Sequence, residues 1–515
     1  MAQHIKAEIM QRAAARKEKQ CFVQVMPVDG SQCLEPTPLP HSDPSISEEL
    51  NVTSAALNLP GLSDTDIYFT SLYLDTVFAF IFPWYEISGL SGGRSWLLSM
   101  LLDNKAIFHS AISLSSYFFT LVLAKDASHT RRMPCGQHLW NTLGRHMDLS
   151  LQMIKQDMED LGNAGTQTDV FREARLVGGI VQLLIFESAM TRGSDWEMHL
   201  AAALDVFSKI FQTHGIQEGN LNLESVLLAI SRPSIFDGLK LGFRVWNADQ
   251  AAFQFFAAVL LFVDILSSTS LQKSPRLRHC YPQLIDDGDA DCAQDRKGYH
   301  LLHMEQYIGC QGWVLLLIGE ISALDAWKGG FESETYTAAE TFKNRAMELE
   351  LRLQRGISSL EGTQSAMKTG GAPGYLRPYD QQDTTNRGQE RNIATSIWSH
   401  ATGIYLALVT KGWHPENSAI RHHVQYVLAF LGQVSSQACL RNLVWPLCVA
   451  GCVASADQEE AFRAIGPALG PLQAFGTMSQ ALRIMECVWQ RRDQLEESWT
   501  IADCVGTLGY KVLLV

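Results

Sequence analysis

Apolar residues recur every three or four positions along the chain from about Asp64 onward, which is the spacing of helices that bury one face. Pro83 ends the first of these runs. No run of alternating apolar and polar residues is strong enough to predict a sheet. The predicted helices cover residues 73–81, 96–101, 111–118, 138–161, 177–190, 197–211, 251–267, 311–327, 338–353, 393–411, 418–433, 440–454, 459–469 and 477–492. The pattern therefore predicts an all-α fold, a multi-helix body with antiparallel helix pairs.

One of these pairs is placed by its short connection. Helices over 177–190 and 197–211 are separated by only a few residues, so they are expected to run antiparallel. Ser194 and Asp195 precede the second helix and are candidates to cap it, because their side-chain oxygens accept hydrogen bonds from free backbone N–H groups.

Two segments interrupt the helical pattern. Residues 1–60 begin with a short basic helix and continue into a Pro-, Ser- and acid-rich stretch, which predicts a disordered tail. Residues 355–392 are rich in Gly, Ser, Gln, Thr and Asp, which predicts a flexible insertion. The expected domains are the tail, 1–60, and one helical body, 61–515, that contains this insertion.

Composition narrows the classes of protein. A chain of 515 residues is long enough for two to four folding units, although helical arrays can merge into one body. The apolar share of 46% is sufficient for a large core. The formal net charge of -13 argues against broad coating of nucleic acid, because phosphate binding needs concentrated Lys and Arg.

The cysteines and the absence of a long apolar run bear on the compartment. The 11 cysteines are odd in number and scattered through apolar stretches, as free thiols in a reducing compartment are. The most apolar run, Phe255–Val263, is far shorter than the roughly 20 residues of a membrane span. The first 20 residues lack an apolar signal core. We therefore expect an intracellular protein with no membrane partner.

An acidic cluster is the first candidate for chemistry. Asp286, Asp287, Asp289 and Asp291 stand together, and paired carboxylates on a helix can hold magnesium. Gly288 interrupts the helix that such a site needs, so a solvated acidic loop is the favoured interpretation.

Two further pairs have the residue types of metal ligands. Cys448 and Cys452 are four positions apart, which puts both thiols on one side of a helix. His422 and His423 are the only adjacent histidines among 15. Neither pair has the further ligands of a metal site nearby in the sequence, and buried structural roles are favoured for the cysteines.

The sequence also lacks the known motifs of phosphate-binding loops and of hydrolase nucleophiles. It contains neither GxGxxG nor GxxxxGK[ST] nor a GxSxG elbow. The turn over 91–95 favours a helix cap over an anion site, and the basic residues Arg12, Arg16, Lys17 and Lys19 favour a solvated cluster. We therefore predict no catalytic, cofactor-binding or metal residue, no cofactor, and a protein that is not an enzyme.

Short aromatic and aliphatic motifs follow one another in a specific order from about Leu72 to the C-terminus. In chain order they are Tyr73-Leu74-Asp75, Phe82-Pro83-Trp84-Tyr85, Gly93-Arg94-Ser95-Trp96-Leu97-Leu98, Ala111-Ile112-Ser113-Leu114-Ser115-Ser116-Tyr117, Phe186-Glu187, Trp196, His199-Leu200, Phe255-Phe256-Ala257-Ala258, Asp264-Ile265-Leu266-Ser267, Gly309-Cys310-Gln311-Gly312-Trp313, Ala326-Trp327-Lys328, Ile397-Trp398-Ser399-His400-Ala401, Tyr405-Leu406, Trp445-Pro446-Leu447, Ala450-Gly451-Cys452, Gly476-Thr477, Ile484-Met485-Glu486-Cys487-Val488-Trp489, Arg491 and Trp499. This succession resembles the fungal-specific transcription factor regulatory domain, of the type in acriflavine sensitivity control protein and regulators of secondary-metabolite gene clusters.

The resemblance implies a nuclear regulator of transcription, plausibly of a secondary-metabolite gene cluster. The family usually joins this body to a six-cysteine binuclear zinc cluster that reads DNA. Upstream of the matching region stand only Cys21 and Cys33, so we expect no direct DNA binding. The expected partners are a DNA-bound transcription factor or other transcription proteins, with homo- or heterodimers compatible with this interpretation.

Two alternatives remain open on the sequence. The chain is a truncated gene product whose zinc cluster lies upstream, or it is a helical enzyme or small-molecule binder with a site in its apolar interior. The sequence does not identify target genes, the sign of regulation, an effector or the oligomeric state.

Overall fold

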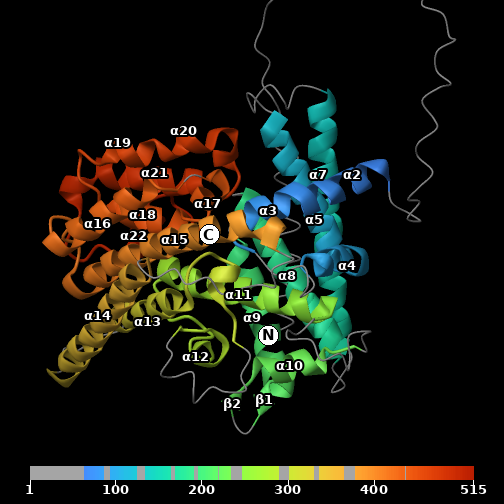
Figure 1. The fold of residues 1–515 in the computed structure, drawn as a ribbon, viewed down its shortest axis with the longest axis horizontal. Helices are drawn as coiled ribbons and strands as arrows, with labels where there is room; N and C mark the ends of the chain where they lie inside the picture. The colour runs from blue at the N-terminus through green and yellow to red at the C-terminus, as the bar shows by residue number, and fades with distance from the viewer. Residues whose placement is uncertain are drawn as a thin grey trace, which may run out of the picture.

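The computed structural model describes residues 63–85, 93–123, 134–163, 169–190, 195–217, 220–232, 246–288, 301–329, 336–364, 377–434 and 436–515. Helices dominate these residues, and the predicted all-α class is confirmed (Figure 1). Within the described ranges the strands are β1 (Ile216–Gln217) and β2 (Asn220–Leu221), which pair antiparallel as a minimal hairpin. The sequence analysis missed this hairpin, because two residues are too few to show alternation.

The helices form an N-terminal half, a central group and a C-terminal half (Figure 1). The N-terminal half contains α2 (Asp64–Leu72), the π-helical turn η1 (Tyr73–Val77), α3 (Phe78–Ile81), α4 (Ser95–Asp103), α5 (Lys105–Leu123), α7 (Pro134–Asn163), α8 (Val170–Met190), α9 (Trp196–His214) and α10 (Leu223–Ala229). The central group contains α11 (Ala248–Leu271), α12 (Tyr281–Leu284), η3 (Met304–Gln306), α13 (Gly312–Gly329), α14 (Tyr336–Gln364) and α15 (Arg377–Lys411). The C-terminal half contains α16 (Ser418–Leu431), α17 (Gln437–Arg441), α18 (Val444–Cys452), α19 (Glu459–Arg463), α20 (Ile465–Leu469), η4 (Gly470–Ala474), α21 (Met478–Gln490), η5 (Arg492–Gln494) and α22 (Ile501–Gly506).

The predicted pair 177–190 and 197–211 corresponds to α8 and α9, which pack against each other. Asp195 is the N-cap residue of α9 by position, but its side chain makes no capping hydrogen bond. Ser194 lies outside the described residues.

Helix α11 is the central element of the fold. It packs against α4, α8, α9, α13 and α22, and it is buried along nearly its whole length. By length and composition it is apolar enough to cross a membrane, yet 94% of its apolar window is buried inside the protein. The most apolar run, 255–263, is shorter than the helix, because flanking Ala, Ser and Thr residues also belong to the buried helix, which has 24 residues.

Aromatic side chains connect the central group to both halves. Phe255 of α11 packs on Trp96 of α4 with ring centroids 5.0 Å apart. On the other side, Trp398 of α15 stacks on Trp445 of α18 at 5.5 Å and 7°, and the Trp445 indole donates to the Thr269 hydroxyl of α11 at 2.9 Å. One continuous cluster of buried side chains consequently runs from Tyr73 to Leu514, and the helical array shares one core.

Helix α14 lies along the outer edge of the central group (Figure 1). On the face toward α13, Glu320 binds the guanidinium groups of both Arg278 and Arg345. Gly356 leaves room for the Trp313 ring, which lies 2.5 Å from where a Cβ would stand. These contacts fix the direction of α14 against α13 and α15.

The predicted flexible insertion over 355–392 is wrong at both ends. Helix α14 continues to Gln364 and α15 begins at Arg377, while residues 365–376 lie outside the described residues. The composition argument failed because Gln, Arg and Glu, which are common in this segment, are also good helix formers. The predicted tail over 1–60 lies outside the described residues.

Candidate functional site: a histidine-lined groove between helices 14, 15 and 16

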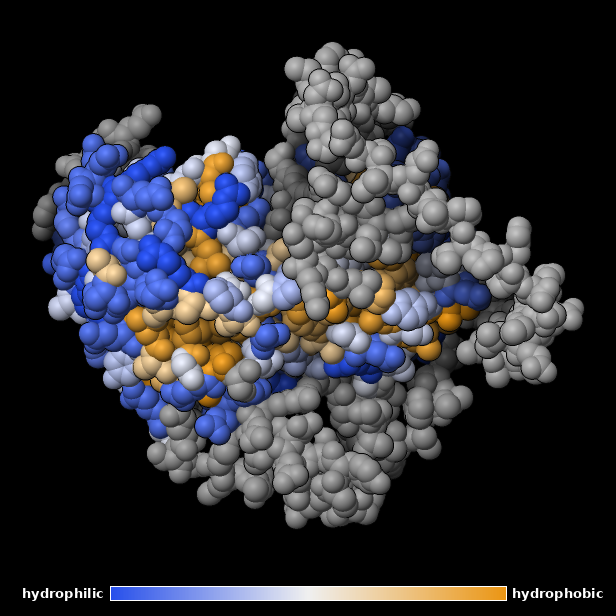
Figure 2. Space-filling view, turned by 90° about the horizontal axis from the view of Figure 1, so that it is seen from above, coloured by the Kyte–Doolittle hydropathy of each residue, from blue (hydrophilic) through white to orange (hydrophobic). Residues whose placement is uncertain are grey.

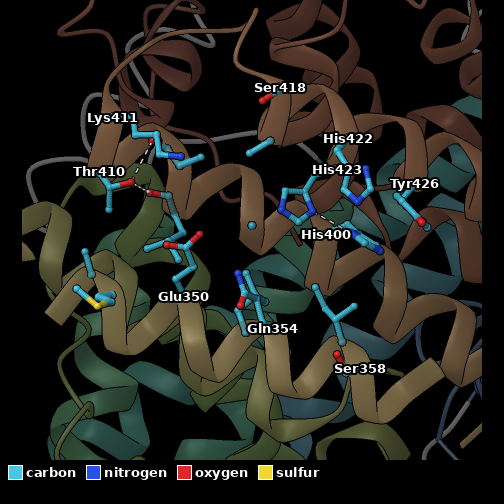
Figure 3. A pocket seen from close by; sticks show the side chains of 18 of the residues that line it. Glu350, Gln354, Ser358, His400, Thr410, Lys411, Ser418, His422, His423 and Tyr426 are labelled. Atoms are coloured by element: carbon cyan, nitrogen blue, oxygen red, sulfur yellow. Dashed lines mark hydrogen bonds between the residues drawn. The ribbon is translucent and has the colours of Figure 1, made fainter. Parts of the chain in front are cut away.

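A groove of about 960 Å³ opens between α14, α15 and α16 (Figure 3). Helix α15 forms its floor, and α14 and α16 form its two walls. Its volume is at the upper end of the range for ligand pockets in proteins. Both apolar side chains, such as Met347 and Leu406, and polar side chains, such as Gln354 and Thr410, line it. We call it the α14–α16 groove.

A glycine on the floor determines how the α16 wall approaches α15. A Cβ on Gly403 would lie 2.5 Å from Nε2 of His423. Because Gly403 has no side chain, the His423 ring packs directly over the α15 backbone. This close approach brings His423 to His400, one turn before Gly403 on the same helix.

His400 and His423 form a hydrogen-bonded pair across α15 and α16, with their Nδ1 atoms 2.9 Å apart. The His400 ring also stacks on Tyr426 of α16, with centroids 4.6 Å apart and an angle of 16°. Figure 3 shows the pair beside His422 at the α16 wall. We call these two residues the groove dyad.

Both rings of the groove dyad are neutral at physiological pH. Burial, followed by the neighbouring His423 and His422, lowers the pKa of His400 to about 3. Burial, followed by His422, lowers the pKa of His423 to about 4. Two neutral rings that share an Nδ1–Nδ1 hydrogen bond have opposite tautomers, because one Nδ1 donates and the other accepts. The dyad therefore carries one Nε2–H donor and one Nε2 acceptor.

The groove is suited to binding. Opposite the dyad, Figure 3 shows Glu350, Gln354 and Ser358 of α14 at the other wall. Across the described ranges no three His, Cys, Asp or Glu side chains gather in a way that would hold a metal ion. Where the floor is formed by the neutral dyad, an apolar or hydrogen-bonding occupant covers it without burying a charge.

A second histidine pair, His109 and His146, joins α5 and α7, with Nδ1 atoms 3.0 Å apart. Nε2 of His146 lies 3.0 Å from Nη2 of Arg145 and 3.2 Å from Oδ1 of Asp66. Burial lowers the pKa of His146 to about 4. In the neutral ring, Nε2 accepts from Arg145 in one tautomer and donates to Asp66 in the other, so these two contacts correspond to opposite tautomers.

The predicted acidic cluster is only partly described. Asp286 lies 2.9 Å from Nδ1 of the half-exposed His303 and accepts a hydrogen bond from the Gly288 backbone. Asp289 and Asp291 lie outside the described residues. The described part is a loop in which Asp286 contacts His303 and the Gly288 backbone.

Cys448 and Cys452 of α18 are buried free thiols. Hydrogen bonds with Cys448 and Cys504, and then burial, raise the pKa of Cys452 well above its usual value. A raised thiol pKa disfavours the thiolate that binds metals or attacks electrophiles. This arrangement fits the structural role favoured for the pair.

The turn before α4 carries no side-chain cap in its described part. Arg94 is the N-cap residue and makes no capping hydrogen bond. Its guanidinium lies 5.7 Å from the centroid of the Phe78 ring instead. Ser91 and Gly92 lie outside the described residues, as do Arg12, Arg16, Lys17 and Lys19 of the basic tail.

The sequence analysis noted one member of the groove dyad but assigned it no role. His423 stood out because it is adjacent to His422, but its partner His400 is 23 positions away. Gly403, three residues after His400, was the available signal, because a glycine inside a long helix often marks a close approach. No pattern in a single sequence connects these positions across two helices.

Comparison with known proteins extends over nearly the whole described body. The model of the family described as "Fungal specific transcription factor domain" matches residues 68–515. The chain is 37% identical to transcription factor dibT of Pestalotiopsis microspora, over 86% of this chain and 70% of that protein. It is 25% identical to the trichothecene biosynthesis transcription regulator TRI10 of Trichoderma arundinaceum, over 82% of this chain and 91% of that protein.

A further relative is the pestheic acid cluster transcriptional regulator 3 of Pestalotiopsis fici, which is 25% identical over 86% of this chain and 73% of that protein. No solved structure matches. The α14–α16 groove lies within the matched residues.

Proposed function

We propose, from the premise that this chain belongs to the fungal-specific transcription factor domain family, that it controls a secondary-metabolite gene cluster from the nucleus. The chain is a transcription regulator, as its family and its relatives are. The observation that carries the proposal is the match over residues 68–515 together with the names of the relatives. Two of those names specify trichothecene biosynthesis and the pestheic acid cluster.

In the proposed mode of action, the helical body contacts a DNA-bound transcription protein. The formal net charge of -13 supports a protein contact over a phosphate contact for this body, because DNA repels an acidic surface. Figure 2 shows a band of apolar residues across the described surface seen from above, between hydrophilic edges. Apolar surface bordered by polar residues is typical of protein–protein contacts.

Deletion of the gene tests the proposal. We expect the transcripts of one contiguous biosynthetic cluster to change several-fold or more, while transcripts elsewhere stay within replicate scatter. Reintroduction of the unaltered gene is the matched control and should restore the transcripts. An unchanged transcriptome under conditions in which the gene is expressed would refute control of a cluster.

Location and DNA contact are tested with the tagged full-length protein. We expect nuclear fluorescence and chromatin immunoprecipitation at cluster promoters that disappears when a co-purifying DNA-binding protein is deleted. Immunoprecipitation that persists without any such partner would show direct DNA binding and overturn the proposed partner contact. Exclusion from the nucleus would overturn the proposed location.

A further inference from the structure

A small pocket of about 210 Å³ lies where three helices of the central group end. It is lined by Gln272, which caps the C-terminus of α11, by Asp325 and Lys328 from the last turns of α13, and by Val409 from the last turn of α15. Residues 497–501, which lead into α22, also line it. We call it the Asp325 pocket.

Hydrogen bonds show that the three helices end beside one another. The Gln272 side chain donates to Oδ1 of Asp325 at 3.2 Å, which joins the end of α11 to that of α13. The Lys328 ammonium donates to the Val409 carbonyl at 2.9 Å, which joins the end of α13 to that of α15. The C-terminus of a helix carries about half an elementary negative charge, so the convergence of three of them attracts cations.

Asp325 adds a buried carboxylate to these helix ends, and its side chain is part of the pocket lining. Its Oδ2 accepts from the Tyr405 hydroxyl at 3.2 Å, while Oδ1 accepts from Gln272. Each oxygen has a second lone pair for a further donor. Burial raises the pKa of the Asp325 carboxyl, although both hydrogen bonds and the charge of Lys328 lower it. A further cation would therefore stabilise this carboxylate.

The charged groups of the described lining also favour a cation over an anion. They are the carboxylates of Asp325 and Glu497 and the ammonium of Lys328. Nε2 of His414 lies 2.7 Å from the Glu497 carboxylate and holds that exposed side chain in place. An anion in the pocket would be attracted by Lys328 but repelled by both carboxylates and by three helix ends.

We propose that the Asp325 pocket binds a small primary alkylammonium ion, with the ammonium group on the Asp325 carboxylate. Lys328 shows that the surroundings accept this chemistry, because its own ammonium is bound to a carbonyl at the end of α15. The alkyl chain lies along the apolar side chains of the lining, Leu408, Trp499 and Ile501. At about 30 Å³ per water molecule, the volume equals that of about seven waters, which suits a chain of about four carbons.

The walls of the pocket are fixed before any ligand binds. Gly412, which follows α15, has a φ of 81°, and a Cβ there would lie 2.8 Å from the Glu497 carbonyl oxygen. The next residue, Trp413, donates its backbone N–H to the same oxygen at 2.9 Å. Thr500 and Asp503 form a capping box at the start of α22. Little ordering of the chain is therefore needed for binding.

A ligand-observed NMR titration of the purified full chain at pH 7.5 tests the proposal. n-Butylammonium chloride should bind with a dissociation constant on the order of 1 mM, a value typical of so small a ligand. Butan-1-ol and sodium butanoate have the same chain length and serve as matched neutral and anionic controls. Each should bind at least about tenfold more weakly, because neither can form a charge-assisted hydrogen bond with Asp325 as a donor cation.

Two variants should change the affinity in opposite directions, which a general loss of structure cannot do. Asp325→Asn should raise the dissociation constant for n-butylammonium about tenfold, because it removes the negative charge. Lys328→Met should lower it about threefold or more, because it removes a competing cation. Asp264→Asn is the matched control: this carboxylate is also buried and bound to a tyrosine hydroxyl, Tyr281, but lies outside the pocket. It should leave the dissociation constant unchanged.

Three results would overturn the inference. The first is no binding of n-butylammonium up to about 50 mM, well above the expected dissociation constant. The second is binding of butan-1-ol or butanoate as tight as that of n-butylammonium, which shows that the charge is not recognised. The third is an affinity that neither Asp325→Asn nor Lys328→Met changes, which places the ligand elsewhere. The titration uses the purified chain alone, so none of these results bears on the proposed control of a gene cluster.

Discussion

Acidification should destabilise this protein through its neutral buried histidines, and the groove dyad allows the effect to be isolated. The pKa of His400 is lowered to about 3 and that of His423 to about 4, against about 6.5 for an unperturbed histidine. Each ring therefore binds fewer protons in the folded state than in the unfolded state. Its contribution to stability is present above pH 6.5 and is lost as the pH falls toward the folded pKa.

The magnitude follows from the two pKa values of each ring. At pH 5 the unfolded ring is almost fully protonated, whereas a folded ring with a pKa of about 4 or below is mostly neutral. Linkage then gives a loss of about 2 kcal/mol per ring between pH 7.5 and pH 5.0, or about 4 kcal/mol for the dyad. This figure counts the two dyad rings alone. His422 of α16 and Glu350 of α14 face the same groove.

The assay compares the free energy of unfolding in urea at pH 7.5 and pH 5.0 for the unaltered protein and for His400→Gln/His423→Gln. Glutamine keeps donor and acceptor capacity but does not titrate. The double variant should therefore lose about 4 kcal/mol less on acidification than the unaltered protein does. His146, whose pKa is also lowered to about 4, is present in both proteins and cancels in the comparison.

Ser358→Ala, on the α14 wall of the same groove, removes no titratable group and should leave the loss on acidification as it is in the unaltered protein. If the dyad variant loses as much stability between the two pH values as the unaltered protein, the dyad is not neutral in the folded state. The assignment of opposite tautomers would then fail with it.

Three further substitutions have consequences that the structure specifies. Asp264→Asn should destabilise the protein by about 1–3 kcal/mol in urea unfolding, because the buried carboxylate accepts from two backbone N–H groups and from the Tyr281 hydroxyl. Trp445→Ala should cost about 3–5 kcal/mol in the same assay, since the fully buried indole stacks on Trp398. Gly403→Ala places a methyl group 2.5 Å from Nε2 of His423. It should displace that ring and diminish the pH dependence of stability.

The helical fold was largely predictable because its signal is local. Apolar positions at a spacing of three or four identify a buried face without knowledge of what covers it. The pair of helices α8 and α9 was placed correctly for this reason, and the short connection supplied its direction. The boundaries of α14 and α15 were wrong because polar residues that are good helix formers extend both helices into the segment assigned to the insertion.

The groove was not predictable from one sequence, because it depends on contacts between helices. His400 and His423 meet only because Gly403 allows α16 to approach α15. The exposed side of α14 is mostly polar, so its pattern indicates a solvated face.

The two histidine pairs of this chain show how the same local arrangement differs in its surroundings. The pair His109 and His146 lies beneath α2, where Asp66 and Arg145 lie within 3.2 Å of the His146 ring. The groove dyad has the same Nδ1–Nδ1 contact and its pKa values are likewise lowered by burial, yet it lines an open groove between α14 and α16. A neutral pair covered by its own chain holds two helices together and needs nothing further. A neutral pair at the floor of a groove does the same for α15 and α16, and it also leaves a surface that an apolar or hydrogen-bonding occupant can cover without desolvating a charge.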